Sequence, residues 1–206
     1  MFLSQQTQTA GKHTIHSATR FVTDSFFLAT ERLILRPWKP VDFPLICRLA
    51  KNPQVMRYVN QGKSWSNKQI LSFIHKQQKS FQEDSYCRWI VEDKSNYNFV
   101  GFCGVGVFEP IGFLEIGWWI EEKLWGKGFA TEAARCALEH AFKEIRIPHL
   151  KSVVHPENKA SLAVIRKIGF LQQQTGFLGD YQRSPKNIPI ITYSRDNPYL
   201  IPSSQK

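Results

Sequence analysis

The chain has 206 residues, of which 27 are lysine or arginine and 17 are aspartate or glutamate, so its formal net charge is +10. Hydrophobic residues make up 42% and aromatic residues 13%, which excludes an intrinsically disordered chain. No apolar run approaches the ~18 residues that a membrane-spanning helix needs. The length predicts one domain.

Cysteine and histidine spacing argues against disulfide scaffolds and metal centres. The four cysteines are widely scattered, and no C-x-x-C or H-E-x-x-H pattern occurs. We therefore expect reduced thiols, no bound metal and a cytoplasmic protein. The positive charge is compatible with nucleic acid, a membrane surface or a phosphorylated cofactor, but the basic residues form no continuous block, so a solvated positive surface is the simpler interpretation.

Composition divides the chain into three parts. Residues 1–27 are rich in Ser, Thr and Gln and lack the apolar core of a secretory signal, so we expect an irregular N-terminal extension. The folded domain is expected over 28–196, followed by a C-terminal tail over 197–206.

The first half of the domain predicts one strand, two helices and then three strands, of which the first two form a hairpin. Leu28–Arg36 alternates and ends before Pro37, as a strand does. Helices are predicted over 40–51 and over 66–81, the second with Ser66 as N-cap. The remaining predicted strands are 86–92, 99–108 and 114–120, the first two joined by a turn over 93–98.

The second half predicts a β-α-β crossover. Small and apolar residues recur at helical spacing over 130–144, and a short β-branched strand follows over 150–154. A helix over 158–167 is expected to end at Gly169, and strands over 170–176 and 188–195 complete the domain. The pattern is that of a mixed α/β domain with antiparallel strands first.

The most informative segment runs from Leu114 to Ala133, where a strand leads through a glycine-bearing turn directly into a helix. Gly126 and Gly128 would let a diphosphate approach the main chain, and the helix N-terminus favours an anion there. Lys123 and Lys127 add positive charge. An ordinary strand-to-helix turn is the alternative.

Other phosphate motifs do not fit this segment. A Walker loop needs a glycine where Glu121 stands, and a dinucleotide fingerprint needs one where Thr131 stands. The run Gly101-Phe-Cys-Gly-Val-Gly106 has a similar spacing but no helix follows it, which predicts strand packing or a bulge.

Three motifs in the same order resemble the GNAT superfamily of acetyl-CoA-dependent N-acetyltransferases, and its RimJ/RimL-like branch in particular. They are Thr30-Glu-Arg-Leu-Ile-Leu-Arg-Pro37, Lys123-Leu-Trp-Gly-Lys-Gly128 and the block from His155 to Phe170. The family's acyl-CoA signature begins with Gln or Arg, where this chain has Lys123. The resemblance implies a central, mostly antiparallel twisted sheet flanked by helices, and transfer of an acetyl group from acetyl-CoA to a primary amine in a direct ternary complex.

The resemblance also implies a set of cofactor-binding residues. Main chain at Trp119 and Ile120 would contact the pantetheine arm, and the turn would bind the diphosphate through backbone donors. Asn158 would hold the pantetheine, although it also suits helix capping, as does Thr131. The expected cofactor-binding residues are Trp119, Ile120, Lys123, Gly126, Lys127, Gly128, Phe129, Ala130, Thr131, Asn158 and Ser161.

Two residues are candidates for proton transfer. Many relatives carry a tyrosine acid seven positions after the asparagine, but here that position is Ile165, so Ser161 is the replacement we select. Glu115 stands where related enzymes carry a base, and its apolar neighbours favour a raised pKa. An exposed strand glutamate is an equal alternative for Glu115. His155 and Tyr181 are secondary candidates near the acceptor.

The acceptor is open at this stage. A protein N-terminus fits the branch, and a small-molecule amine remains an alternative; segments 41–81 and 177–187 would select it. Nucleic acid is expected as a partner only if the acceptor is part of a ribosome. The protein is expected to be a monomer or homodimer. Two other classes stay open: a CoA-binding regulatory protein without transferase activity, and a basic nucleic-acid-binding module.

Overall fold

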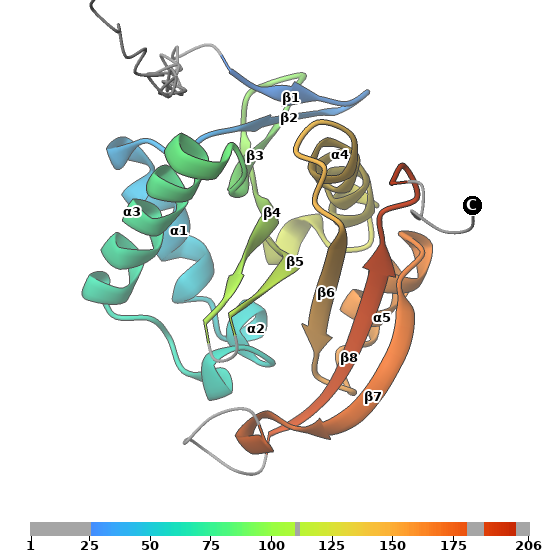
Figure 1. The fold of residues 1–206 in the computed structure, drawn as a ribbon. Helices are drawn as coiled ribbons and strands as arrows, with labels where there is room; N and C mark the ends of the chain where they lie inside the picture. Colours follow the sequence, from blue (N-terminus) through green and yellow to red (C-terminus); the bar gives the residue numbers. More distant parts are fainter. Residues whose placement is uncertain (1–25, 110–111, 181–187, 201–206) are drawn as a thin grey trace, which may run out of the picture.

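The computed structural model describes residues 26–109, 112–180 and 188–200, which form one eight-stranded sheet with helices on both faces (Figure 1). The strand order is β1-β2-β3-β4-β5-β6-β8-β7, and neighbouring strands are antiparallel except β5 and β6, which are parallel. The strands are β1 (Leu28–Ala29), β2 (Leu33–Arg36), β3 (Arg88–Asp93), β4 (Phe99–Phe108), β5 (Phe113–Ile120), β6 (His149–Val154), β7 (Leu171–Phe177) and β8 (Pro189–Asp196).

Five α-helices and four short 3₁₀ turns connect these strands within the described residues. The helices are α1 (Phe43–Ala50), α2 (Pro53–Met56), α3 (Asn67–Asp84), α4 (Phe129–Lys143) and α5 (Lys159–Lys167). The 3₁₀ turns are η1 (Pro40–Asp42), η2 (Asn60–Gly62), η3 (Glu122–Leu124) and η4 (Leu178–Asp180). The mixed α/β fold class and the β5-α4-β6 crossover are confirmed.

Most expected elements form within a few residues of their predicted bounds. Ser66 caps α3, and its hydroxyl accepts a hydrogen bond from the Gln69 backbone N–H, as the sequence predicts. Gly169 follows α5 with φ +78°, the left-handed conformation expected after a helix.

The prediction of one continuous strand over Leu28–Arg36 is wrong. The segment folds back on itself as the β1–β2 hairpin, because Thr30 exchanges hydrogen bonds with Leu33 through backbone and hydroxyl groups. The apolar alternation continues through the turn, so the pattern alone could not reveal it.

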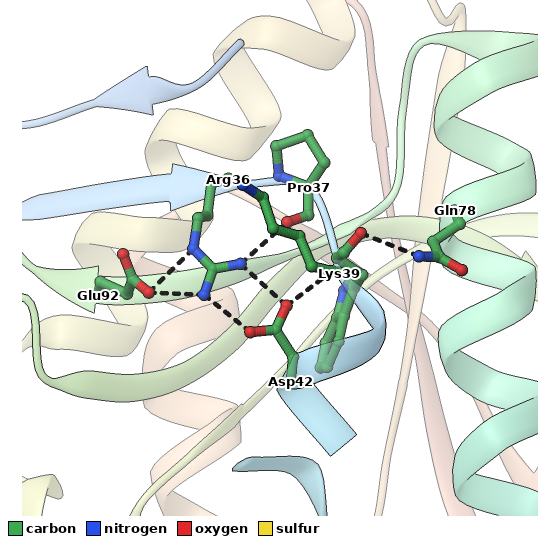
Figure 2. Close-up of polar contacts among 7 residues, drawn as sticks. Arg36, Pro37, Lys39, Asp42, Gln78 and Glu92 are labelled. Atoms are coloured by element: carbon green, nitrogen blue, oxygen red, sulfur yellow. Dashed lines mark hydrogen bonds and ion pairs between the residues drawn. The ribbon is translucent and has the colours of Figure 1, made fainter. Parts of the chain in front are cut away.

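An ion-paired network fixes the entrance to α1 (Figure 2). The Arg36 guanidinium makes two hydrogen bonds of 2.9 Å to the Asp42 carboxylate and a third, of 2.7 Å, to Glu92 on β3. Asp42 is buried and also accepts the Lys39 backbone N–H. Burial alone would lower the pKa of Arg36, but hydrogen bonds to Asp42 and Glu92 raise it above its usual value. The network joins β2, η1 and β3 beneath α1.

The two faces of the sheet are covered by different helices (Figure 1). Phe102 packs against Trp38 and Phe73, on the side of α1 and α3. The next residue, Cys103, interacts with Cys136 of α4, on the opposite side. We call these the α1/α3 face and the α4 face.

Residues near the predicted domain bounds also contact the folded part, since Phe26 packs on Phe81 and buried Asn197 donates to the Phe142 and Ile147 carbonyls.

Candidate active site

The parallel strands β5 and β6 separate soon after they meet. Their register contains a single pair, Glu115 with Lys151, beside which the Ser152 hydroxyl donates to the Ile116 carbonyl at 3.1 Å. Beyond Ile116, the described residues show no pairing between the two strands. The last four residues of β5 therefore keep one edge without a strand partner.

Alternation along β5 decides which main-chain groups face this edge. The Glu121 N–H donates to the Val100 carbonyl on β4, so in an antiparallel ladder Trp119 also faces β4, whereas Trp118 and Ile120 face the other way. The Ile120 carbonyl agrees with this assignment, because it accepts the Trp125 indole N–H at 2.8 Å. The unpaired donors along the opening are therefore the N–H groups of Trp118 and Ile120. Main chain of Trp119, one of the predicted contacts, is turned toward β4.

The glycine-bearing turn lies at the end of this edge. Gly126 and Gly128 have φ values of +76° and +83°, which glycine adopts without strain, and a Cβ at Gly126 would meet no atom within 4 Å. Gly128 is the N-cap of α4 and offers no side chain to the helix. Among the described residues, none of the backbone N–H groups from Gly126 to Thr131 has a hydrogen-bond partner. The turn thus presents six free donors at the positive end of a 15-residue helix.

Side chains of the β1–β2 hairpin bind both the glycine-bearing turn and the first turn of α4. The Arg32 side chain donates to the Lys127 carbonyl at 3.1 Å, lies 4.6 Å above the Phe129 ring and forms an ion pair of 2.6 Å with Glu132. Thr30 donates to the same carboxylate at 2.5 Å. Burial alone would raise the pKa of Glu132, but these hydrogen bonds lower it below its usual value. The network holds the first turn of α4 against the sheet.

Comparison with known proteins agrees with this geometry. Residues 32–171 match the family model described as an acetyltransferase (GNAT) domain. The chain belongs to the GNAT acetyltransferase family. It is accordingly an enzyme that transfers acetyl groups, and this family uses acetyl-CoA as the donor. The predicted family and fold are confirmed.

Individual relatives show how far the similarity extends. The Bacillus subtilis (strain 168) protein YkkB is 32% identical over 151 residues, which cover 72% of this chain and 87% of YkkB. A crystal structure of an acetyltransferase from Agrobacterium tumefaciens strain C58 superposes with a TM-score of 0.70 at 24% identity, covering 82% of this chain and 93% of that one. RimL, a ribosomal L7/L12 alpha-N-protein acetyltransferase solved with coenzyme A, has the same fold, with a TM-score of 0.68 at 16% identity and coverage of 83% and 98%.

The predicted GNAT contacts on α5 start from a helix cap. The Asn158 side chain accepts the Ser161 backbone N–H at 3.1 Å, so the capping role of Asn158 is confirmed. The Ser161 hydroxyl is half-buried and has no partner among the described residues. Ile165 is fully buried in the core, so it offers no acid to the site. For Thr131 the capping alternative is wrong, because the N-cap is Gly128.

On the α1/α3 face, Glu115 forms an ion pair with Arg88. Arg88 Nη2 lies 2.5 Å from Glu115 Oε1, and both side chains are largely buried, with exposed fractions of 13% and 16%. The exposed-glutamate alternative is therefore wrong. Burial raises the pKa of Glu115, while the Arg88 charge and hydrogen bond partly offset that rise. Sequence reasoning missed Arg88, because nothing in the pattern of β3 relates it to a residue 27 positions away.

Aromatic rings form a cluster beside this ion pair. The Trp119 ring lies 4.7 Å from that of Trp65 and 5.0 Å from that of Phe102, and Phe73 joins the same cluster. Trp38 is buried and belongs to the core, whereas Trp65 is half-buried. Trp65 therefore gives the segment 41–81, which we expect to select the acceptor, a partly exposed aromatic ring next to β5.

A second ionic cluster connects α1 to the end of β5. Glu121 is buried and pairs with Arg48 at 2.8 Å and with Lys123 at 3.0 Å, and Asn52 donates to Glu122 at 3.0 Å. Lys123, expected as a cofactor contact, is thus exposed with its ammonium directed at Glu121. Arg48 and Glu121 were not identified from the sequence; the position of Glu121 at the end of β5 was the available signal.

His155, one of the two secondary candidates, packs beside Tyr58. The His155 ring is 5.1 Å from that of Tyr58, and its Nδ1 accepts the Glu157 N–H at 3.2 Å. Tyr181 lies outside the described residues.

No group of three or more potential metal ligands occurs among the described residues, and none of the described helices is long and apolar enough to cross a membrane. Burial raises the pKa of the thiols at Cys87, Cys103 and Cys136, which keeps them protonated.

Proposed function

We propose that this enzyme moves the acetyl group of acetyl-CoA to a primary amine by direct attack in a ternary complex. The observation that carries the proposal is the row of six N–H groups from Gly126 to Thr131, which have no hydrogen-bond partner in the described part of the chain and lie beside the β5 edge that lacks a strand partner there. A diphosphate needs several donors and room to approach the main chain. The free N–H groups supply the donors, and Gly126, where a Cβ would meet no atom within 4 Å, leaves room.

The cofactor-binding residues fall into two groups under this proposal. Gly126, Lys127, Gly128, Phe129, Ala130 and Thr131 would bind the diphosphate through their backbone. Ile120 would donate its N–H toward the pantetheine or the thioester, Asn158 and Ser161 would meet the arm from α5, and Trp119 would contribute its ring. Lys123 would add charge at the entrance.

The chemistry assigned to the chain is proton transfer and charge stabilisation. Bound acetyl-CoA supplies a thioester whose carbonyl carbon the neutral amine attacks, so a carbon–nitrogen bond forms and the carbon–sulfur bond breaks. Glu115, through Oε2 or one water, takes the proton from the acceptor ammonium. The Ile120 N–H stabilises the developing oxyanion. As the intermediate collapses, the nitrogen loses its second proton, which the Ser161 hydroxyl relays to the leaving thiolate.

A protein N-terminus suits the acceptor site better than a polyamine. A polycation needs a carboxylate cluster, but the Glu115 carboxylate is already paired with Arg88. RimL, which shares the fold, is named for acting on a ribosomal protein N-terminus. A net charge of +10 would favour a target within anionic ribosome context. A small-molecule amine remains the second acceptor class. We place the enzyme in the cytoplasm as a monomer or homodimer.

The test combines calorimetric titration of acetyl-CoA with a thiol-release assay over peptides and small amines. We expect micromolar binding and release with one amine class. Gly126→Glu should abolish binding, because the new carboxylate would repel the diphosphate. Gly112→Glu is the matched control, since Gly112 also has a positive φ, of +80°, and open space around its Cα, but lies at the other end of β5.

Equal affinity for acetyl-CoA in the two glycine variants would contradict the site. Binding without release from any amine would instead support a CoA-binding regulatory protein. Steeply salt-dependent RNA binding with no affinity for acetyl-CoA would support the nucleic-acid-binding alternative.

A further inference from the structure

The Arg88 side chain crosses a strand to reach its partner. Arg88 begins on β3 and its guanidinium lies over Gly106 of β4 before it meets Glu115 of β5. A Cβ at Gly106 would lie 2.2 Å from Arg88 Nη1, and one at Gly117 would lie 3.6 Å from Nε. The absence of a side chain at Gly106 therefore provides space that the guanidinium occupies, whereas a Cβ at Gly117 would make only an ordinary van der Waals contact with it.

Contacts at both ends fix this side chain. The Arg88 backbone N–H donates to Gln77 Oε1 of α3 at 2.9 Å, and its carbonyl accepts the Trp38 indole N–H. The guanidinium then binds one oxygen of Glu115, Oε1. Glu115 Oε2 has no hydrogen-bond partner among the described residues. Since the only buried side-chain nitrogen or oxygen without a hydrogen-bond partner among them is Glu121 Oε2, Glu115 Oε2 is accessible to solvent. One oxygen of the carboxylate is held and the other is free.

The charged groups facing Glu115 are few. Arg88 approaches from β3, and Lys151 is the register partner on β6, but the Lys151 ammonium lies 5.0 Å above the Phe113 ring. Helix α3 contributes the uncharged Gln77. Arg88 is therefore the cation that governs the charge state and orientation of this carboxylate.

We propose that Arg88 is a positioning residue for acetyl transfer: it holds Oε1 of Glu115 so that Oε2 stays ionised and directed at the acceptor amine. This inference rests on the proposed function and on Glu115 as its base. It also assigns a purpose to Gly106 in the run Gly101–Gly106, which is to leave room for the guanidinium.

The test is the pH dependence of kcat/KM for thiol release, measured with one amine for every variant. A positive charge next to a carboxylate lowers its pKa, so Arg88→Met should raise the pKa of Glu115. The acidic limb of the profile should then move to higher pH, by about one to three pH units. Lys151→Met removes a positive charge that makes no hydrogen bond to Glu115, and it should leave the limb in place. Glu115→Gln should abolish the limb.

Gly106→Ala tests the same idea with both charges retained. The added methyl group must displace the guanidinium, so the limb should move in the same direction by a smaller amount, and this variant decides the matter if Arg88→Met does not fold. An unmoved limb in Gly106→Ala and in any folded Arg88→Met, with activity lowered uniformly or not at all, would overturn the inference while leaving the proposed function intact. A wild-type protein that releases no thiol with any amine would overturn both.

Discussion

The indole N–H of Trp125 donates to the backbone carbonyl of Ile120 at 2.8 Å, across the five residues that separate the end of β5 from the glycine-bearing turn. This bond satisfies the carbonyl of a residue whose main chain faces the opening between β5 and β6. The neighbouring N–H of Ile120 is left without a partner among the described residues. At Ile120 the strand therefore presents a donor and no free acceptor, which is the polarity that an approaching carbonyl oxygen requires.

Trp125→Phe should weaken acetyl-CoA binding. The substitution removes the donor and leaves the Ile120 carbonyl facing the cofactor, at a cost of about 1 kcal/mol, which corresponds to an about fivefold higher Kd. Because Trp125 is 45% exposed, its replacement should change the melting temperature little. Calorimetric titration and thermal unfolding measure both quantities. An unchanged Kd would mean that this bond has no part in binding.

Ser161→Ala should separate catalysis from binding. The cap of α5 uses the backbone N–H of Ser161, so removing the hydroxyl leaves the helix intact. If this hydroxyl protonates the leaving thiolate, kcat should fall about a hundredfold, while the Kd for acetyl-CoA should change far less, because the backbone donors of the turn remain. Asn158→Ala is the informative comparison, since it removes the cap and should cost about 1 kcal/mol of stability. An unaltered kcat in Ser161→Ala would assign the proton to water.

The sequence is a good guide to local structure here. The glycines of the turn, the Ser66 cap and the helical spacing of α4 are each decided within a few residues, and all three are present in the structure. Asn158 likewise caps the helix that it begins. Local rules fail at Thr30, where apolar alternation conceals a hairpin.

Long-range polar pairs could not be predicted in the same way. Arg32 meets Glu132 across 100 residues, and Arg88 meets Glu115 through a space that depends on Gly106 of a third strand. Such pairs depend on strand order and register, which no local pattern encodes. The orientation of Trp119 was missed for a related reason, because it follows from the first hydrogen bond of the β4–β5 ladder.

Arg36→Met should be strongly destabilising. It leaves the Asp42 carboxylate, whose side chain is 3% exposed, without its bidentate partner, and breaking a buried pair in this way costs about 3–5 kcal/mol. Lys79→Met is the control, since its pair with Glu83 is 3.8 Å long and exposed on both sides, and its loss should cost less than about 0.5 kcal/mol. Urea unfolding measures the free energy of unfolding of both variants against the wild type. Similar losses would show that the Arg36 network is not a principal support of the domain.

Glu132→Gln should destabilise the protein in a pH-dependent manner. Hydrogen bonds from Thr30 and Arg32 lower the pKa of Glu132 in the folded state, so the ionised carboxylate stabilises the fold above its unfolded pKa of about 4.3, and that contribution is lost as the pH falls through the folded pKa. The glutamine cannot titrate. At pH 7 we expect a loss of about 1 kcal/mol, reduced by the exposure of Arg32.

The difference in unfolding free energy between wild type and Glu132→Gln should therefore shrink as the pH is lowered from 7 to 3. Glu139→Gln lies on the same helix and breaks an exposed pair with Lys143, so it should leave the pH dependence unchanged. Because Glu132 fixes Arg32 against the Lys127 carbonyl, its loss should also raise the Kd for acetyl-CoA. A difference in stability that stays constant with pH would show that packing, and not the charge of Glu132, joins the hairpin to the glycine-bearing turn.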